Sequence, residues 1–247
     1  MSSLTEKTCF IGIHKAPPNL SREEFERKAG ELGDAIAALP VAQKNLLKLD
    51  IISQNTLIDE HMKGVGLPVP APTVVMSAEY EMLKDPALQR LFTESDDFGF
   101  RKHATAFAAD VFTIVDAPDV TADLHVICVY YCPPQISVDV FGQKMKELME
   151  HIASQSIRDN FSHYSLWLQN DAVDRHLQEL GYPAPKPLLV VRADSKHLDH
   201  MKEIFEHSEV SRLLNEGIRD LGFHRDGDDP TEASCFSADI ATKLSKY

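Results

Sequence analysis

"FIGIHKAPPNLSREEF", residues 10–25, lies over "VICVYYCPPQISVDVF", residues 126–141, when the chain is aligned with itself at an offset of 116. Three features recur in this alignment: a Pro-Pro pair (Pro17-Pro18 and Pro133-Pro134), a serine (Ser21 and Ser137) and a phenylalanine (Phe25 and Phe141). Self-similarity at a fixed offset is the signature of a fold built from like units.

A second match supports the same division of the chain. "QNTLIDEHMKGVGLPVPAP", residues 54–72, aligns with "QNDAVDRHLQELGYPAPKP", residues 169–187, at an offset of 115. The following "TVVMSAE" (73–79) aligns with "LLVVRAD" (188–194), and "ADVFT" (109–113) is matched to "ASCFS" (233–237). We infer a duplication, with a first repeat over residues 1–117 and a second over 118–247.

Each repeat predicts the same order of elements. An apolar strand (9–13; 126–131) is followed by a helix (22–39; 138–156) with Ser21 or Ser137 as its N-cap. A second strand (43–53; 162–169), the proline-rich connector, a third strand (73–78; 188–193), a helical region (86–102; 208–221) and a fourth strand (110–115; 234–238) complete it. The order βαββαβ is ferredoxin-like. It predicts an α+β fold in which two tandem repeats form one pseudo-dimeric α+β barrel, with helices outside and a cavity between the sheets.

This layout resembles the dimeric α+β barrel superfamily and its EthD-like branch, over nearly the whole chain. The likeness rests on the order of elements and on "MSAEYEMLKDPALQRLF" (76–92), "SDDFGF" (95–100) and "RADSKHLDHMKEIFEHSEVSRLL" (192–214). The chain is similar to the fused, tandem form found in fungal biosynthetic proteins. The resemblance implies a cofactor-independent enzyme that binds an aromatic or polyketide-like substrate in the barrel and moves protons.

Composition and charge exclude several classes of partner. With 25 Lys and Arg against 38 Asp and Glu, the 247-residue chain carries a net charge of −13, which repels nucleic acid and anionic membrane surfaces. No apolar run reaches the roughly 18 residues that a membrane span needs, and the N-terminus lacks a secretory signal. We expect a cytoplasmic protein.

The sequence offers no sign of a cofactor or a metal. It lacks a glycine-rich phosphate loop, a G-x-S-x-G elbow and an H-E-x-x-H motif. Its four cysteines (Cys9, Cys128, Cys132 and Cys235) lack zinc-site spacing. Most of them lie in strand-like runs, where free cysteine usually serves as a small buried residue.

The connector holds an Asp-x-His pair in both copies. Asp59 and Asp174 could orient His61 and His176 as general bases, or they could cap a turn that leads into the prolines. Presence in both copies favours the structural interpretation, and the histidines are kept as alternative bases at the cavity mouth. Gln54 and Gln169, which open the connector, are expected to bind substrate.

Positions where the copies differ are better candidates for chemistry. His14 in the first copy corresponds to Tyr130 in the second, and both end the first strand. Because strand side chains alternate, Gly12 and His14 share a face, and we expect this face to look into the barrel cavity. His14 is then the base and Tyr130 the donor. Tyr164 and Trp167 are expected to wall an aromatic pocket, and Arg192 to stabilise negative charge.

These features predict an isomerase or cyclase (an intramolecular lyase) acting on an aromatic or polyketide-type substrate, as in chalcone-isomerase-like ring closure. Histidine has a pKa near 6.5 and can remove a phenolic or activated C–H proton, while Tyr and Arg stabilise the anion. Two alternatives stay open: a haem-binding oxidative enzyme of the same fold, and a protein that only binds a hydrophobic ligand. A homodimer through the outer surfaces also stays open.

Overall fold

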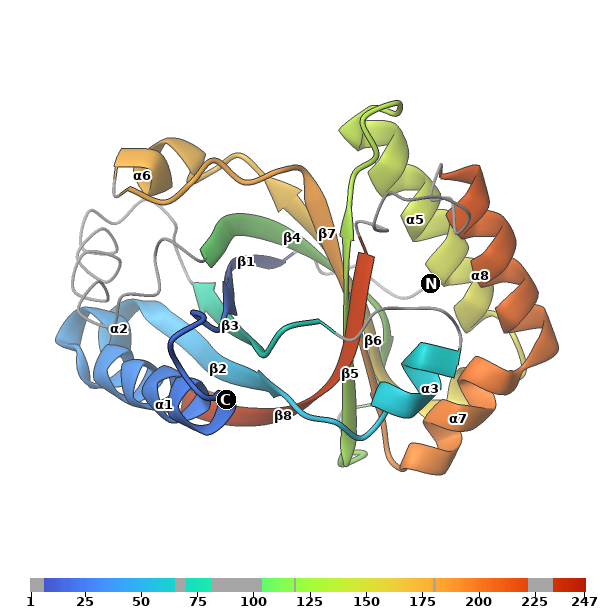
Figure 1. Cartoon of the computed structure of the whole chain (residues 1–247), viewed down its shortest axis with the longest axis horizontal. Helices are drawn as coiled ribbons and strands as arrows, with labels where there is room; N and C mark the ends of the chain where they lie inside the picture. The colour runs from blue at the N-terminus through green and yellow to red at the C-terminus, as the bar shows by residue number, and fades with distance from the viewer. Residues whose placement is uncertain (1–6, 65–69, 81–103, 118, 180, 222–232) are drawn as a thin grey trace.

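Strands from both halves of the chain close into one barrel with helices packed on its outside (Figure 1). The computed structural model describes residues 7–64, 70–80, 104–117, 119–179, 181–221 and 233–247. The first half supplies β1 (Lys7–Lys15), α1 (Arg22–Ala38), α2 (Pro40–Asn45), β2 (Leu46–Gln54), α3 (Asp59–Gly64), β3 (Thr73–Tyr80) and β4 (Ala104–Asp116). The second supplies β5 (Leu124–Tyr131), α5 (Val138–Ala153), β6 (Phe161–Asn170), α6 (Asp174–Glu179), β7 (Leu188–Ser195), α7 (Leu198–Glu206), α8 (Ser208–Asp220) and β8 (Ala233–Ser245).

The strand order confirms the predicted fold class. Around the barrel the described strands run β1-β3-β2-β8-β5-β7-β6-β4, with antiparallel pairing throughout. Each half therefore contains the ferredoxin-like order 4-1-3-2, as β4-β1-β3-β2 and as β8-β5-β7-β6. The two halves join where β4 pairs with β6 and where β8 pairs with β2.

The register corrects one predicted match between the halves. Ile11 pairs with Phe107, and its counterpart Ile127 pairs with Phe236, so the two phenylalanines are equivalent. The segment equivalent to "ASCFS" (233–237) is thus "ATAFA" (104–108), five residues before the segment that the sequence suggested. The sequence match aligned the wrong phenylalanine, because it had no information on strand pairing.

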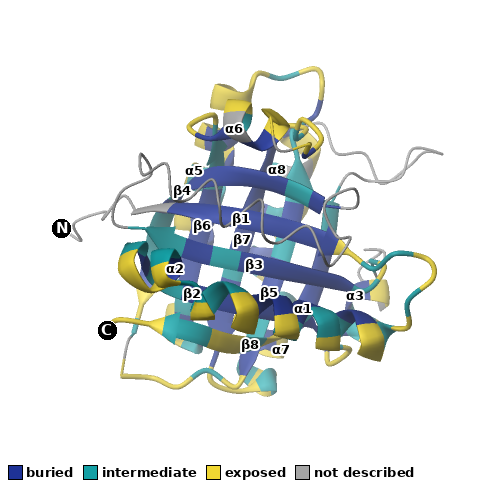
Figure 2. Ribbon diagram, turned by 90° about the vertical axis from the view of Figure 1, so that its left-hand side faces the viewer, coloured by how far each residue is buried: buried dark blue, intermediate teal, exposed yellow. Residues whose placement is uncertain are grey.

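Apolar side chains fill the inside of the barrel. One buried cluster draws on all eight strands and on no helix, so it must lie in the interior: Cys9, Ile11, Ile13, Ile52, Val75, Phe107, Ala109, Val111, Ile127, Val129, Trp167, Leu188, Val190, Phe236 and Ala238. Most strand residues are buried, except in the C-terminal half of β8, whereas the helices expose their outer faces (Figure 2). The predicted substrate cavity between the sheets is thus occupied by the side chains of the strands themselves.

Helices cover the outer faces of both halves, and each connector crosses to the opposite half. Phe25 and Leu32 of α1 pack on the first half, while α5, α7 and α8 cover the second. Met62 of α3 joins the cluster beneath α7 and α8, and Leu177 of α6 joins that of the first half. Figure 1 shows α3 beside α7 and α6 at the other side of the barrel. None of the described helices is long and apolar enough to span a membrane.

Several boundaries differ from those predicted. Ser21 and Ser137 cap their helices as expected, accepting from the N–H of Glu24 (3.2 Å) and Val140 (3.4 Å). Residues 40–45 form α2 instead of the start of a strand, because Pro40 opens a helix well at its first position. The fourth strands are longer than predicted, and α7 was not predicted as a separate helix. The predicted helical region 86–102 and the segment "SDDFGF" lie outside the described residues.

Candidate functional site

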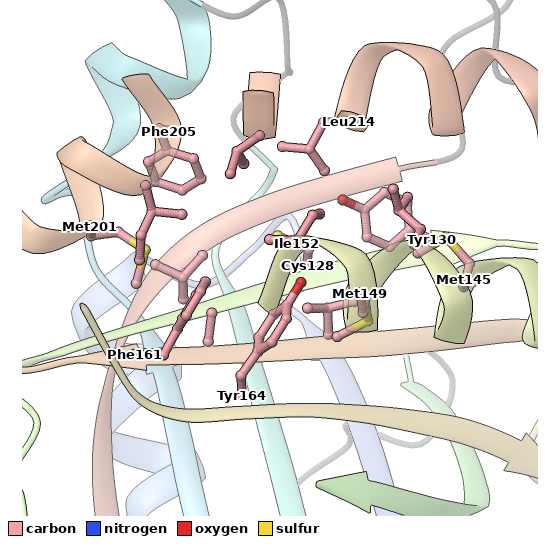
Figure 3. Close-up of a pocket in the computed structure, with 16 residues that line it drawn as sticks. Cys128, Tyr130, Met145, Met149, Ile152, Phe161, Tyr164, Met201, Phe205 and Leu214 are labelled. Atoms are coloured by element: carbon pink, nitrogen blue, oxygen red, sulfur yellow. The ribbon is translucent and has the colours of Figure 1, made fainter. Parts of the chain in front are cut away.

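A cavity of about 80 Å³ lies between the sheet of the second half and helices α5, α7 and α8 (Figure 3). We refer to it as the helix-side pocket. Its walls come from three strands and three helices: Val126, Cys128, Tyr130, Met145, Leu148, Met149, Ile152, Phe161, Tyr164, Val191, Ala193, Met201, Ile204, Phe205, Val210 and Leu214. The strand residues among them point out of the barrel, on the side of the sheet opposite to the interior cluster.

Two phenol groups are the only hydroxyls among these lining side chains. Tyr130 comes from β5 and Tyr164 from β6, and in Figure 3 both rings rise from the sheet towards the helices. Tyr164 is held by a stacked contact with Phe161, with 4.5 Å between ring centroids. The rest of the lining is hydrocarbon and sulfur. The pocket therefore suits an apolar molecule that carries one or two hydrogen-bond acceptors.

Burial keeps both phenols protonated. Removal from water disfavours the phenolate and raises the pKa of Tyr130 to about 12. The pKa of Tyr164 rises well above its ordinary value of 10, first through burial and then through the neighbouring Tyr130. At neutral pH the two groups can donate hydrogen bonds to a ligand oxygen and cannot serve as bases.

Cys128, a lining residue of the pocket, is bonded to a second cysteine. Cys128 of β5 and Cys235 of β8 are opposite in the strand register, with Cα atoms 4.0 Å apart, and their sulfurs are bonded. Cys9 and Cys132 do not take part in a disulfide. The sequence suggested that most of the cysteines are small buried residues, and it did not identify this pair because the pairing of β5 with β8 joins residues 107 positions apart.

His14 and Tyr130 do not share a cavity. β1 and β5 are four strands apart in either direction around the barrel, and both side chains point outward. The predicted inward direction of the Gly12 face was wrong: Ile11 and Ile13, on the opposite face, fill the interior. Gly12 makes room for the ring of His14 itself, since a Cβ at Gly12 would lie 2.8 Å from its Nε2. Burial lowers the pKa of His14 to about 4.

Trp167 and Arg192 lie inside the barrel, away from the pocket and from Tyr164. Trp167 belongs to the interior cluster, and its Nε1 donates to Ser165 Oγ at 3.1 Å. The guanidinium of Arg192 donates to both carboxylate oxygens of Asp194, at 2.6 to 3.1 Å. This pairing and His125, 3.0 Å from the same carboxylate, hold the pKa of Asp194 at about 2 although burial opposes it.

The histidines of the connectors lie at the edges of the helix layers. His61 packs its ring against Phe205, a lining residue of the helix-side pocket, with 5.0 Å between centroids. Its Nε2 is buried and has no hydrogen-bond partner within the described residues. The side chain of His176 lies outside the described part of the structure.

Gln54 and Gln169 are engaged with the backbone of their own connectors. The Oε1 of Gln54 accepts from Thr73 N at 3.0 Å, and that of Gln169 accepts from Leu188 N at 3.1 Å. In both halves the side chain therefore fixes the start of the third strand. This contact occurs twice and explains why both copies carry the residue.

A haem held through a histidine does not fit the helix-side pocket. The described lining offers no imidazole, and the ring of His61 is separated from the cavity by Phe205. Ligands of drug size already require roughly 300–1,000 Å³, compared with a cavity of about 80 Å³ here. Among the described residues, no group of three or more His, Cys, Asp or Glu is placed to hold a metal ion.

Comparison with known proteins reveals likeness in fold but not in sequence. No family model matches the chain. A search of curated proteins likewise gives no match.

Solved structures align over nearly the whole chain. An anthrone oxidase-like protein aligns with a TM-score of 0.57 at 8% identity, over 98% of this chain and 96% of its own. A candidate monooxygenase of Fusobacterium nucleatum aligns with a TM-score of 0.52 at 10% identity, over 99% and 94%. A candidate monooxygenase of Lactobacillus acidophilus aligns with a TM-score of 0.50 at 10% identity, over 97% of this chain and 95% of its own.

These structures overturn the predicted activity. They carry the names of oxidative enzymes, whereas the sequence predicted an isomerase or cyclase of the flavonoid type. The geometry agrees with the correction, because the base and donor assigned to the cyclase, His14 and Tyr130, stand on opposite sides of the barrel. The alignments and the closed eight-stranded barrel show that the chain has the fold of the dimeric α+β barrel proteins.

Proposed function

We propose that the protein is an oxidative enzyme that acts on a small aromatic ketone or phenol in the helix-side pocket, with dioxygen as the oxidant. One observation carries the proposal: two buried, protonated phenols face an otherwise apolar cavity. The names of the aligned structures, which include an anthrone oxidase-like protein, support this class of chemistry.

The reaction class has a balanced form that needs no further reductant. A CH₂ group flanked by aryl rings and conjugated with a ketone is acidic, and its loss of a proton gives an enolate. The enolate transfers electrons to dioxygen, a C–O bond forms and the O–O bond breaks, so that R₂CH₂ + O₂ gives R₂C=O + H₂O. The negative charge of the enolate lies on the ketone oxygen, where Tyr130 and Tyr164 can donate hydrogen bonds in a low-dielectric site.

The substrate proton needs an acceptor, and the imidazole of His61 packs against the wall of the pocket. Its ring touches Phe205, which forms the wall on that side. A turn of the Phe205 ring would bring the buried Nε2 of His61 to the cavity. We therefore propose His61 as the base, in place of His14.

The pocket must widen to take an aromatic substrate. A cavity of 150 Å³ holds benzene, so about 80 Å³ is too small for one ring without rearrangement. Met145, Met149 and Met201 line the cavity, and methionine side chains repack easily. We propose that these side chains move aside when substrate enters between the sheet and α7.

Oxygen consumption tests the proposal. Anthrone and simpler phenolic ketones are supplied to the protein in an oxygen electrode, while thermal shift reports their binding. We expect uptake with 1:1 stoichiometry to substrate, lowered at least tenfold by Tyr164→Phe. Tyr131→Phe is the matched control, because Tyr131 packs against the interior cluster. Uptake unaffected by Tyr130→Phe and Tyr164→Phe would refute the assignment.

The same experiment separates the second candidate, a protein that only binds an apolar ligand. The lining residues of the pocket include no carboxylate and no imidazole, which favours that candidate. Saturable binding of the ketone without any oxygen uptake would select it.

The proposal also covers the evolutionary origin and the oligomeric state of the chain. We propose that residues 1–117 and 118–247 arose by tandem duplication, and that the chain is a fused relative of the EthD-like branch. Since the barrel closes within one chain, a homodimer would form through the outer surfaces.

A further inference from the structure

A second hollow lies beside the N-terminal half of α5, where it meets β4, β6 and β7. Its volume is about 290 Å³, and we refer to it as the α5 notch. Its lining mixes polar and apolar side chains: Asp110, Phe112, Val138, Asp139, Phe141, Gly142, Gln143, Lys146, Leu168, Gln169, Leu188 and Leu189. It shares no lining residue with the helix-side pocket.

The first half of the chain shows what occupies the equivalent place. At the offset of 116, Val138 corresponds to Arg22 and Gly142 to Glu26. Arg22 Nη1 donates to the carbonyl oxygen of Gln54 at 3.2 Å and lies 4.0 Å from Glu26. The counterpart of Gln54 is Gln169, which lines the notch. The change to valine and glycine in the second half thus removes a guanidinium and leaves a hollow.

Glu26 has no acidic counterpart in the second half, but a carboxylate at the neighbouring strand junction is kept. Asp239 in the first half accepts from Asn55 at 3.0 Å, and Asp110 in the second accepts from Asn170 at 2.8 Å. Asp139 adds a second carboxylate to the lining. Against these two, the lining carries one cation, Lys146, whose Nζ lies 4.7 Å from the ring centroid of Phe112. Among these lining residues the carboxylates outnumber the ammonium groups, a composition that suits a cationic ligand better than an anionic one.

The remaining wall is more apolar than its counterpart. Phe112 replaces Ala241 of the first half, because β4 and β8 correspond at an offset of 129. Phe141, Leu168 and Leu188 continue this wall. A ligand therefore needs both a cationic head and a short hydrocarbon chain.

We propose that the α5 notch binds an alkylguanidinium, whose head takes the place that Arg22 holds in the first half. The head would donate to the Asp110 carboxylate and to the Gln169 carbonyl, and the chain would lie against Phe112 and Leu168. Charge-assisted hydrogen bonds of this kind are stronger than neutral ones. The site does not depend on the oxidative function proposed for the other pocket.

Titration with butylguanidinium tests the proposal, and butylurea is the neutral control of the same shape. Binding to the full-length protein is followed by calorimetry and by NMR shifts of α5 residues. We expect butylguanidinium to bind at least tenfold more tightly than butylurea. Asp110→Asn, which can still accept from Asn170, should weaken binding about tenfold.

Restoring the first-half residues supplies the decisive variant. Val138→Arg with Gly142→Glu should remove binding, because the protein would then fill its own notch. A Cβ at Gly142 would lie 3.5 Å from Leu168, an ordinary contact, so the variant is expected to fold. Equal binding of the two probes, or unchanged binding by the double variant, would overturn the proposal. Leu214→Trp, in the helix-side pocket, should leave the affinity for butylguanidinium unchanged.

Discussion

His14 and Tyr130 hold equivalent places at the ends of β1 and β5, yet they stand on opposite sides of the barrel. Each points out of the barrel. Tyr130 borders the helix-side pocket, whereas the ring of His14 covers Gly12 on the other half. The two residues therefore lie in two separate environments, although the sequence match between the halves places them at equivalent positions.

Replacement of His14 should therefore leave ligand binding in the helix-side pocket unchanged. We expect His14→Gln to bind an aromatic ketone within about twofold of the parent protein, whereas Tyr130→Phe loses the hydrogen bond and binds several-fold more weakly. Calorimetry with the same ketone measures both. A tenfold loss in His14→Gln would show that the two sites communicate.

The stability of the protein should depend on pH through His14. Its pKa is about 4 in the folded state because of burial, against about 6.5 in the unfolded chain. The unfolded state then binds the extra proton between these values, so stability is complete above pH 6.5 and falls as the pH drops towards 4. The loss at pH 4 is on the order of 3 kcal/mol. Urea unfolding between pH 7 and pH 4 measures this dependence, and the free energy of unfolding should fall less steeply with pH in His14→Gln than in the parent protein. Equal pH dependence in the two proteins would show that His14 is not the cause.

The architecture could be predicted because each repeat carries the same strand and helix signals in the same order. Which face of each strand points into the barrel could not be predicted, because both faces are buried. Ile11 and Ile13 fill the barrel, while Phe10 and His14 point out of it and are still only 9% and 5% exposed. Alternation identifies a core face only where the other face is polar.

The helix-side pocket escaped prediction for a different reason. Its outer wall includes Met201, Ile204 and Phe205 of α7, a segment that was not predicted to be a separate helix. Tyr164 was identified, but it was grouped with Trp167, which lies on the opposite side of the same strand. A pocket built between layers depends on tertiary contacts that local patterns do not contain.

Loss of the Cys128–Cys235 bond should destabilise the protein. The bond closes a loop with a sequence separation of 107, and long loops gain about 2–4 kcal/mol from such a link. Under oxidising conditions, Cys235→Ala should lower the free energy of unfolding by that amount. Cys132→Ser, at a free and half-exposed thiol, is the control. Peptide mass mapping without reductant must find the linked pair in the parent protein, and two free thiols there would contradict the prediction.

The asparagines of the connectors should stabilise the barrel at its two junctions. Asn55 Nδ2 donates to Asp239 at 3.0 Å across the β2–β8 junction, and its Oδ1 accepts from Leu57 N at 3.2 Å. We expect Asn55→Ala to cost about 1–2 kcal/mol in urea unfolding. Asn170→Ala should cost a similar amount, since Asn170 makes the same pair of contacts at the β4–β6 junction. Asn215→Ala, on the exposed side of α8, should cost less than 0.5 kcal/mol by comparison.

Filling the helix-side pocket should abolish its ligand binding without unfolding the protein. Leu214 of α8 is only partly buried and borders the cavity, so Leu214→Trp can place an indole in the space of about 80 Å³ with small shifts of the methionines. We expect a loss of affinity of more than tenfold for an aromatic ketone. Leu57→Trp, at a side chain that is 56% exposed, controls for the added tryptophan. Unchanged affinity in Leu214→Trp, with a fold intact by circular dichroism, would place the ligand elsewhere, because no aromatic ring could share the filled cavity.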